Sequence, residues 1–302
     1  MRIGIIGAGS IGLLFAAYLS DTYEVTVYTR SDRQSEDIRS KGLALKESDE
    51  CFSKEVNVAP IHMWSGNEEL TIITVKQHQL PKVINTINSV GAKSLLFLQN
   101  GMGHIKFLKD AIADNIFLGS VEHGAYKENG HSVQHNGKAL TRVAVYRGDE
   151  SLLRSFVKGA PSNFPFVVEA DYFQMLQAKL VINAVINPLT AVLRVENGLL
   201  VENPYYYKLL KELYSEIANI LNLNEEDGCL EKIVSICKNT AQNRSSMLKD
   251  LEAARKTEVE AILGYLIDMA KENDVKASLV RGLYFAVKGM ESMEEEGLPW
   301  EG

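Results

Sequence analysis

The sequence has 302 residues, of which 46% are hydrophobic and 24% are charged, and its formal net charge is −7. This length suffices for two domains with full cores, and the composition is that of a soluble globular protein. The acidic balance argues against a nucleic-acid-binding protein, which usually needs a basic face. Its three scattered cysteines favour reduced thiols over a disulfide framework or a metal cluster, so we expect no metal site.

The beginning of the chain favours a cytoplasmic location. The first predicted strand starts at Arg2, which leaves no room for a secretory signal peptide. No apolar run approaches the roughly 20 residues that a membrane-spanning helix requires. We therefore expect a cytoplasmic protein with no membrane partner.

The N-terminal half alternates apolar strands with helical patterns, which is typical of a parallel sheet covered by helices. The predicted strands are Arg2–Ile6, Glu24–Tyr28, Leu70–Val75, Ser94–Leu98 and Ile116–Ser120, with short extended pieces at Leu43–Lys46 and Val56–Pro60. Hairpin-turn signals at Asn129-Gly130 and Asn136-Gly137 predict an antiparallel extension of the sheet over Gly124–Tyr146. We expect a last strand at Phe166–Glu169.

Nearly everything after Asp171 has a helical pattern. Asn203 and Pro204 predict the cap and first residue of a helix that continues over Tyr205–Leu221. Further predicted helices cover Glu225–Gln242, Glu258–Asn273 and the segment after Ala277. We therefore predict an α/β domain over residues 1–170 and an all-helical domain over residues 171–302, with the ligand site in the cleft between them.

A glycine-rich turn follows the first predicted strand. It reads Gly7-Ala8-Gly9-Ser10-Ile11-Gly12, and a helical pattern follows it. In a dinucleotide site the first glycine permits the tight turn, the second lets the pyrophosphate approach the backbone, and the third allows close helix–strand packing. The alternative is a glycine-rich structural turn, but the order strand, turn, helix, strand is the context that the dinucleotide fingerprint requires.

The end of the second strand bears on the choice of cofactor. An NAD site usually has an acidic residue there for the ribose 2′-hydroxyl, whereas this chain has Arg30. A guanidinium suits a 2′-phosphate, so the sequence favours NADP. The alternatives are a surface arginine at a strand end and a contribution from the nearby Asp32.

Two polar residues follow later strands of the predicted sheet. Lys76 comes after Thr74-Val75, and Asn100 comes after Leu98-Gln99. Ligands of open α/β sheets bind beyond the carboxyl ends of the strands, so both residues are expected near the nicotinamide. A solvated lysine and a turn asparagine are the alternatives.

A polar stripe runs along an otherwise apolar helix. Lys179, Asn183 and Asn187 recur every four residues, and the residues between them are Leu, Val, Ile or Ala. Buried amines and carboxamides need hydrogen-bonding partners or a ligand, and burial lowers the pKa of a lysine. Reduction of a carbonyl by hydride creates an alkoxide that needs a proton, which Lys179 would donate. The alternative is a lysine that extends to solvent from an interdomain helix.

Two further segments carry hydrogen-bonding groups. The run Asn243–Leu248 follows a predicted helix and fits either a binding segment or a helix cap. Thr257 and Glu260 fit a capping box, which places Glu258 in the first turn of a helix. A carboxylate is favoured there by the helix dipole, so Glu258 matters chemically only if it faces Lys179 or a substrate.

Taken together, these residues resemble the ketopantoate reductase (2-dehydropantoate 2-reductase) family over essentially the whole chain. The resemblance is carried by GAGSIG at 7–12, Arg30, VK at 75–76, QNG at 99–101, the K-x3-N-x3-NP run at 179–188, ENG at 196–198, and SSML…D…TE from 245 to 258. It implies a Rossmann-type domain followed by a helical domain, as in the 6-phosphogluconate-dehydrogenase-like group. It also implies NADPH-dependent reduction of 2-dehydropantoate to (R)-pantoate, a step in pantothenate and coenzyme A biosynthesis.

The resemblance also implies roles for individual residues. Lys179 matches the general acid of the family, and Glu258 matches the carboxylate that binds the substrate. The substrate-binding positions correspond to Asn100, Asn183, Asn187, Asn197 and Ser246. The cofactor-binding positions correspond to Gly7, Ala8, Gly9, Ser10, Ile11, Gly12, Arg30, Lys76 and Asn100.

Two alternative functions remain open at this stage. One is an NADP-dependent reductase of a related 2-oxo acid, because the loop between Ser245 and Thr257 carries extra charges that bear on substrate preference. The other is a non-catalytic NADP sensor. The aromatic run Pro204–Tyr207 fits either a dimer interface or the core, so the chain is expected to be a monomer or a homodimer.

Overall fold

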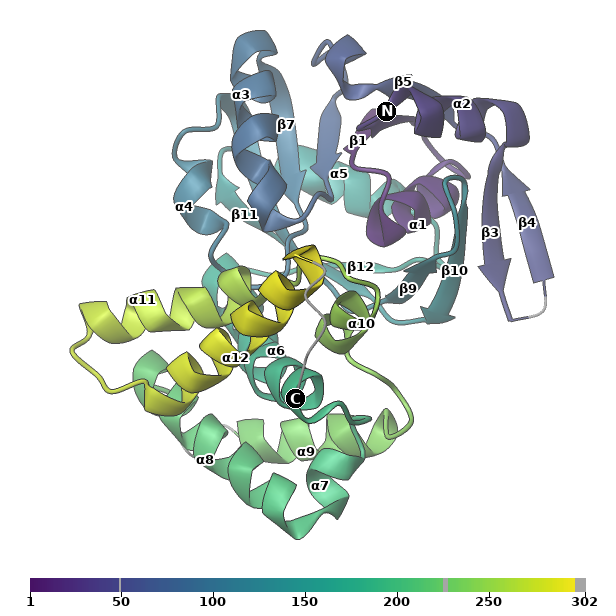
Figure 1. Cartoon of the computed structure of the whole chain (residues 1–302). Helices are drawn as coiled ribbons and strands as arrows, with labels where there is room; N and C mark the ends of the chain where they lie inside the picture. Colours follow the sequence, from purple (N-terminus) through teal and green to yellow (C-terminus); the bar gives the residue numbers. More distant parts are fainter. Residues whose placement is uncertain (49, 225–227, 297–302) are drawn as a thin grey trace. The chain divides into compact units, whose positions relative to one another are not determined.

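The computed structural model describes residues 1–48, 50–224 and 228–296 (Figure 1). These residues form two compact units. The first unit comprises Met1–Gln99 and His104–Leu176, and the second comprises Asn100–Gly103 and the described residues from Gln177 onward. The short segment Asn100–Gly103, from the first half of the sequence, therefore belongs to the second unit. A single boundary along the chain cannot describe this division.

Eight of the described strands form the main sheet of the first unit, in the order β12-β11-β8-β7-β6-β1-β2-β5. The six strands from β8 to β5 in this order are parallel, while β11 runs antiparallel to β8 and parallel to β12. The predicted α/β fold is therefore confirmed, and β11 supplies the antiparallel part of the main sheet, whereas the strands within residues 124–137 of the predicted extension belong to a second sheet. The strands are β1 (Arg2–Ile6), β2 (Glu24–Thr29), β5 (Asn57–Pro60), β6 (Leu70–Ile73), β7 (Ala92–Phe97), β8 (Ala113–Val121), β11 (Thr141–Arg147) and β12 (Phe166–Val168).

A second, four-stranded sheet has the order β4-β3-β10-β9. Its strands are β3 (Leu43–Glu47), β4 (Glu50–Lys54), β9 (Gly124–Lys127) and β10 (Ser132–Gly137). The hairpin predicted at Asn129-Gly130 is confirmed, because β9 and β10 pair antiparallel around it. The hairpin predicted at Asn136-Gly137 is wrong. These two residues end β10 at a register shift, and the chain then crosses to β11 in the other sheet.

Helix α1 (Ser10–Leu19) is buried from Gly12 to Leu19 and has no charged residue. A helix that is apolar all round packs on every side, and α1 contacts β2 of the main sheet and β3, β9 and β10 of the second sheet (Figure 1). Near its C-terminal end, Tyr18 donates a hydrogen bond to Glu47 and lies 2.7 Å from Nδ1 of His135. The second sheet thus holds the helix that begins at the glycine-rich turn.

The other helices of the first unit are α2 (Asp32–Lys41), α3 (Leu80–Val90), α4 (Ile105–Leu108) and α5 (Ser151–Gly159). Short 3-10 turns lie at Ile61–Met63 and Gln77–Gln79. In α3, Leu80, Val83, Ile84 and Ile87 are buried, which is the spacing of one apolar helix face. This amphipathic pattern explains why such helices cover the sheet.

Among the described residues, the second unit is helical apart from its connecting segments, as predicted. Its helices are α6 (Tyr172–Leu193, which the unit division crosses), α7 (Leu199–Glu202), α8 (Pro204–Leu221), α9 (Cys229–Asn239), α10 (Ser246–Glu252), α11 (Tyr265–Glu272) and α12 (Ser278–Glu296), with a π-helical turn, η4, at Glu260–Gly264. The predicted start of α8 is confirmed, because Asn203 Oδ1 accepts the amide of Tyr205 at 2.9 Å. The helix predicted over Glu225–Gln242 is confirmed as the shorter α9, and residues 225–227 lie outside the described residues.

Helix α6, with 22 residues, has the length and apolar composition that a membrane-crossing helix needs. This differs from the expectation that no apolar run is long enough to span a membrane. Core helices of globular proteins have the same length and apolar composition. Here 61% of the apolar window is buried inside the protein. The apolar residues of α6 therefore serve mainly as core.

Candidate active site

The glycine-rich turn connects β1 to α1, which is the strand–turn–helix context that the sequence predicted. Gly7 has φ +113°, and a Cβ on Gly12 would lie 1.8 Å from the carbonyl oxygen of Gly7. Thr74 tightens the turn by donating to this same oxygen at 2.7 Å. By contrast, a Cβ on Gly9 would meet nothing within 4 Å, so the turn is open at its centre.

The start of α1 is suited to an anion. Gly9 is the N-cap and provides no side-chain cap, and the first turn of the helix has no acidic residue. The amide groups of such a turn carry partial positive charge and are available to a phosphate. Of the other predicted residues of the turn, Ala8 is buried, whereas Ser10 and Ile11 are partly exposed.

Two cations lie near this turn, and the sequence interpretation identified only one of them. Arg30 is exposed at the end of β2. Lys127, on β9, donates from Nζ to the carbonyl of Ala8 at 2.9 Å, and its backbone amide donates to Ser10 Oγ at 3.1 Å. Burial lowers the pKa of Lys127, and the nearby charge of Arg30 lowers it further. Only the pairing of the second sheet brings Lys127 here, so no local motif marked it.

The strand ends of the first unit are tied together beyond β6 and β7. Gln99 donates from its amide nitrogen to the carbonyls of Ile73 and Val75, at 2.9 Å each. Lys76 follows β6 and is partly buried. Lys76 thus lies beyond the carboxyl end of a parallel strand, and its position near the nicotinamide stays a prediction.

The polar stripe lies on α6, and its three residues differ in burial. Asn187 is buried, whereas Lys179 and Asn183 are partly exposed. Pro188 continues the helix although it has no amide hydrogen to donate. One turn of helix beyond the stripe, Thr190 Oγ1 lies 2.7 Å from Ser245 Oγ, which ties α6 to the start of α10.

The strand-end residue Asn100 meets Glu258 inside the second unit. Its Nδ2 donates to Glu258 Oε2 at 2.7 Å, although the two residues are 158 positions apart in the sequence. Both side chains are partly exposed, so neither is enclosed by the fold. An amide and a carboxylate held together with accessible surface can bind a hydroxyl or a carbonyl group of a small molecule.

The turn η4 explains how this pair is assembled. This π-helical turn departs from the α-helical bonding pattern, and at its end the amide of Tyr265 donates to the carbonyl of Ile262. The carbonyl of Ala261 accepts the amides of Met102 at 3.1 Å and Gly103 at 3.2 Å. Such interruptions of helical bonding are frequent at functional sites. Here the interruption docks the segment Asn100–Gly103 beside Glu258.

Gly101 permits this docking. It has φ +74°, and a Cβ at this position would lie 2.2 Å from the carbonyl oxygen of Ala261. A residue with a side chain would be strained by the backbone conformation and would collide with the backbone of η4. The glycine after Asn100 is therefore required by a close backbone approach, and not only by a turn.

The two remaining predicted substrate residues, Ser246 and Asn197, lie close to the ends of helices. Ser246 is exposed and is the first residue of α10, whose N-cap is Ser245. Asn197 is buried, and its Nδ2 donates to Thr240 Oγ1 at 2.9 Å. Within the described residues, Asn197 Oδ1 is buried without a hydrogen-bond partner.

The capping box predicted for Thr257 and Glu260 is wrong in its second half. Thr257 Oγ1 accepts the amide of Val259 at 3.1 Å, but the amide of Thr257 donates to Glu291 at 2.7 Å. Glu260 instead accepts the hydroxyl of Tyr284 at 2.6 Å. A tertiary contact from α12 therefore replaces the local contact that the spacing predicted.

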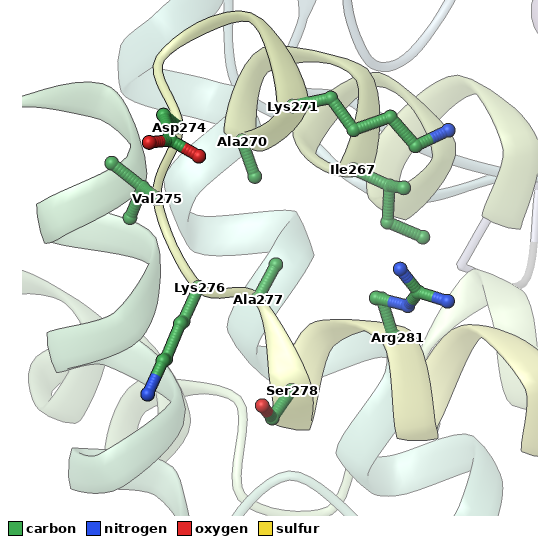
Figure 2. Close-up of a pocket in the computed structure, with 9 residues that line it drawn as sticks. All are labelled: Ile267, Ala270, Lys271, Asp274, Val275, Lys276, Ala277, Ser278 and Arg281. Carbon is green, nitrogen blue, oxygen red and sulfur yellow. The ribbon is translucent and has the colours of Figure 1, made fainter.

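A hollow at the connection between α11 and α12 does not have the features of a binding site. It is lined by three cationic residues among others, but Figure 2 shows the side chains of Lys271, Lys276 and Arg281 extending in different directions. The first amides of α12 are already bonded to the carboxylate of Glu216. Over the described residues, no group of three or more His, Cys, Asp or Glu side chains could hold a metal ion.

Comparison with known proteins identifies two family models on this chain. Residues 3–148 match the model described as Ketopantoate reductase PanE/ApbA, and residues 171–291 match the model of its C-terminal part. The chain is 39% identical over 293 residues to a 2-dehydropantoate 2-reductase of Bacillus subtilis, covering 96% of this chain and 98% of that protein. It is 34% identical to a protein of the same name from Listeria innocua, covering 96% and 97% of the two chains.

Solved structures agree with this result. A crystal structure described as a "Probable 2-dehydropantoate 2-reductase" from Bacillus subtilis has a TM-score of 0.87 at 38% identity, and the match covers 96% of this chain and 100% of that one. A D-mandelate dehydrogenase solved with NADH has a TM-score of 0.86 at 18% identity, which shows a shared fold. The chain therefore belongs to the ketopantoate reductase family, a family of oxidoreductases.

Proposed function

We propose that this chain reduces 2-dehydropantoate to (R)-pantoate with NADPH, in the synthesis of pantothenate and coenzyme A. Its membership of the ketopantoate reductase family and its 39% identity to the Bacillus subtilis 2-dehydropantoate 2-reductase support the reaction. The hydrogen bond between Asn100 and Glu258 is the structural observation that carries the proposal. It joins two polar residues that a substrate site would need. Gly101 and η4 allow the close backbone approach that brings these residues together.

The residues of the glycine-rich turn fit a dinucleotide. The open surface over Gly9 and the uncapped start of α1 would receive the pyrophosphate. Arg30 would hold the 2′-phosphate, because a guanidinium offers a planar fork of donors to phosphate oxygens. Lys76 would lie toward the nicotinamide end, beyond the strand that precedes it. A bound nicotinamide cofactor would supply the hydride for the reduction of the keto group.

Residues of the second unit would hold the 2-oxo acid. Glu258 would accept a hydrogen bond from a hydroxyl of the substrate, and Asn100 keeps this carboxylate in place. The carboxamides of Asn183 and Asn187 can bond to hydroxyl and carbonyl oxygens without competing for the transferred proton. Ser246 and Asn197 complete the set of proposed substrate residues.

Lys179 would act as the general acid. Reduction of the keto carbon places negative charge on its oxygen, and an ammonium group both stabilises this charge and donates the proton that neutralises it. Asn183, the next residue of the helical stripe, is a neutral carboxamide that can bond to the substrate oxygen beside Lys179. A positioned general acid contributes about 10²–10⁴-fold to the rate.

Consumption of NADPH in the presence of 2-dehydropantoate tests the proposal directly. Parallel assays with NADH and with a panel of other 2-oxo acids determine the cofactor and the substrate. We expect the highest kcat/KM with 2-dehydropantoate and NADPH. A higher kcat/KM with another 2-oxo acid would reassign the substrate, and NADPH binding without turnover of any 2-oxo acid would indicate a sensor.

We also propose that the protein is cytoplasmic and works as a monomer or a homodimer. A ketopantoate reductase from Staphylococcus aureus, 23% identical to this chain, is described as dimeric. Tyr205 at the start of α8 is 81% exposed, which would suit a contact between copies. Sedimentation analysis of the wild-type chain and of Tyr205→Ser would test this part of the proposal.

A further inference from the structure

Helix α12 contacts the chain on both sides of Glu258. Glu291 accepts the backbone amide of Thr257 at 2.7 Å and its hydroxyl at 2.6 Å. Tyr284 donates to Glu260 at 2.6 Å, so the residue two positions after Glu258 is held as well. Tyr284 and Glu291 are seven positions apart and therefore lie on one face of the helix.

The contact between Thr257 and Glu291 is buried and complete. Thr257 is 6% exposed and Glu291 is 7% exposed. The hydroxyl of Thr257 donates to Glu291 and also accepts the amide of Val259 at 3.1 Å. The backbone is thus fixed at the residues immediately before and after Glu258.

Glu291 remains charged despite its burial. Lys288, one turn earlier on α12, donates to its Oε2 at 2.7 Å. Burial alone would raise the pKa of Glu291, but the hydrogen bonds from Lys288 and Thr257 lower it below its ordinary value. A charged acceptor forms stronger hydrogen bonds than a neutral one, so this carboxylate holds Thr257 firmly.

The segment Asn100–Gly103 also contacts the chain around Glu258. The carbonyl of Ala261 accepts the amides of Met102 and Gly103, while Asn100 donates to Glu258 itself. Residues 257–261 therefore lie between two supports, one from α12 and one from the segment Asn100–Gly103. Only the first support depends on Glu291.

We propose that Glu291 is a positioning residue for the reduction, acting through Thr257 to keep the Glu258 carboxylate oriented for the substrate. This inference depends on the proposed function, in which Glu258 binds the substrate. It extends that function to a residue of the last helix that touches neither substrate nor cofactor. Positioning errors of about 1 Å at a reacting group can cost on the order of 100-fold in rate.

The test compares Glu291→Gln with a matched variant, Glu216→Gln. Glu216 also accepts two backbone amides of α12, those of Leu279 at 3.1 Å and Val280 at 2.8 Å, but at the other end of the helix. Both variants should lower the melting temperature. Only Glu291→Gln should lower kcat, by about 10- to 100-fold, with the KM for NADPH unchanged. Equal kcat values in the two variants would overturn the proposal.

A double variant separates this inference from the proposed function. Because Glu291 acts through Glu258, adding Glu291→Gln to Glu258→Gln should reduce kcat no further. Multiplied losses would overturn the positioning role. Low turnover in Glu258→Gln with normal turnover in Glu291→Gln would overturn the positioning role alone. Normal turnover in Glu258→Gln would overturn the proposed role of Glu258, and the positioning role with it.

A second pair of variants tests the same hydrogen bond if Glu291→Gln does not fold. Thr257→Val removes the hydroxyl with little change in shape, whereas Thr257→Ser retains it. The proposal requires Thr257→Ser to keep a kcat at least about tenfold above that of Thr257→Val. Equal kcat values in these two variants would contradict it.

Discussion

Replacement of Gly101 by Ala is expected to separate the segment Asn100–Gly103 from η4. The new Cβ would lie 2.2 Å from the carbonyl oxygen of Ala261, so one of the two backbones must move. The movement would break the bonds from Met102 and Gly103 to Ala261 and release Asn100 from Glu258. Two backbone bonds at about 1 kcal/mol each and one charge-assisted bond at about 2 kcal/mol give a loss of about 4 kcal/mol.

The matched control is Gly228→Ala. Gly228 has φ +62° in the same unit, but the nearest heavy atom to its added Cβ is 4.0 Å away. Its substitution therefore introduces the strain of a positive φ, about 1 kcal/mol, without a collision. Gly101 also has a positive φ, so this strain is common to both variants and the lost hydrogen bonds, about 4 kcal/mol, make the difference between them. Thermal unfolding should show Gly101→Ala melting about 12 °C below Gly228→Ala, since about 3 °C corresponds to 1 kcal/mol for a domain of this size.

The kinetic consequence follows from the loss of the Asn100–Glu258 contact. Gly101→Ala should lower kcat/KM for 2-dehydropantoate by at least about tenfold, whereas Gly228→Ala should leave it within about twofold of wild type. The reasoning would be refuted if the two variants had the same melting temperature and the same kcat/KM. That result would mean that docking of the segment Asn100–Gly103 neither stabilises the protein nor positions the residues of the site.

The other predictions concern charge, pH and thiol reactivity in separate parts of the chain. Arg30→Met should weaken NADPH binding about tenfold with little effect on NADH binding. Lys127→Met should weaken the binding of both cofactors, because it removes a bond to the glycine-rich turn. Titration of protein fluorescence measures the dissociation constants of the two cofactors. Burial lowers the pKa of His135. The unfolded chain therefore takes up the proton first as the pH falls below about 6.5, so the free energy of unfolding should fall there in wild type, and the fall should be smaller in His135→Gln. Burial raises the pKa of Cys237 to about 11, so iodoacetamide should label the exposed Cys51 and leave Cys237 unmodified until the protein unfolds; equal labelling rates would contradict this.

Much of the fold could be predicted from local sequence patterns. The apolar runs of the parallel strands, the N-cap of α8 at Asn203 and the hairpin turn at Asn129-Gly130 depend on residues close together in sequence. The second sheet was not predicted, because β3 pairs with β10 across more than 80 positions of sequence. The turn signal at Asn136-Gly137 was misleading for the same reason: β10 finds its partners in β3 and β9 and does not pair with β11.

The candidate site shows the same limit. The spacing of Lys179, Asn183 and Asn187 places them on one helical face, and the structure forms that helix. Their roles remain predictions, as do those of the other proposed site residues. The contact between Asn100 and Glu258, and the contribution of Glu291 to the segment around Glu258, depend on tertiary packing. The capping-box pattern at Thr257 even indicated the wrong glutamate, because a buried carboxylate from α12 competes successfully for the same amide.

The central claim is that the ammonium of Lys179 donates the proton during reduction. The most direct measurement is kcat for Lys179→Ala, together with the dissociation constant for NADPH, against the control Lys208→Ala, which removes an exposed lysine from α8. We predict that kcat of Lys179→Ala falls by at least about 10²-fold while NADPH binding is retained, and that Lys208→Ala resembles wild type. A Lys179→Ala enzyme that turns over 2-dehydropantoate at the wild-type rate would contradict the account.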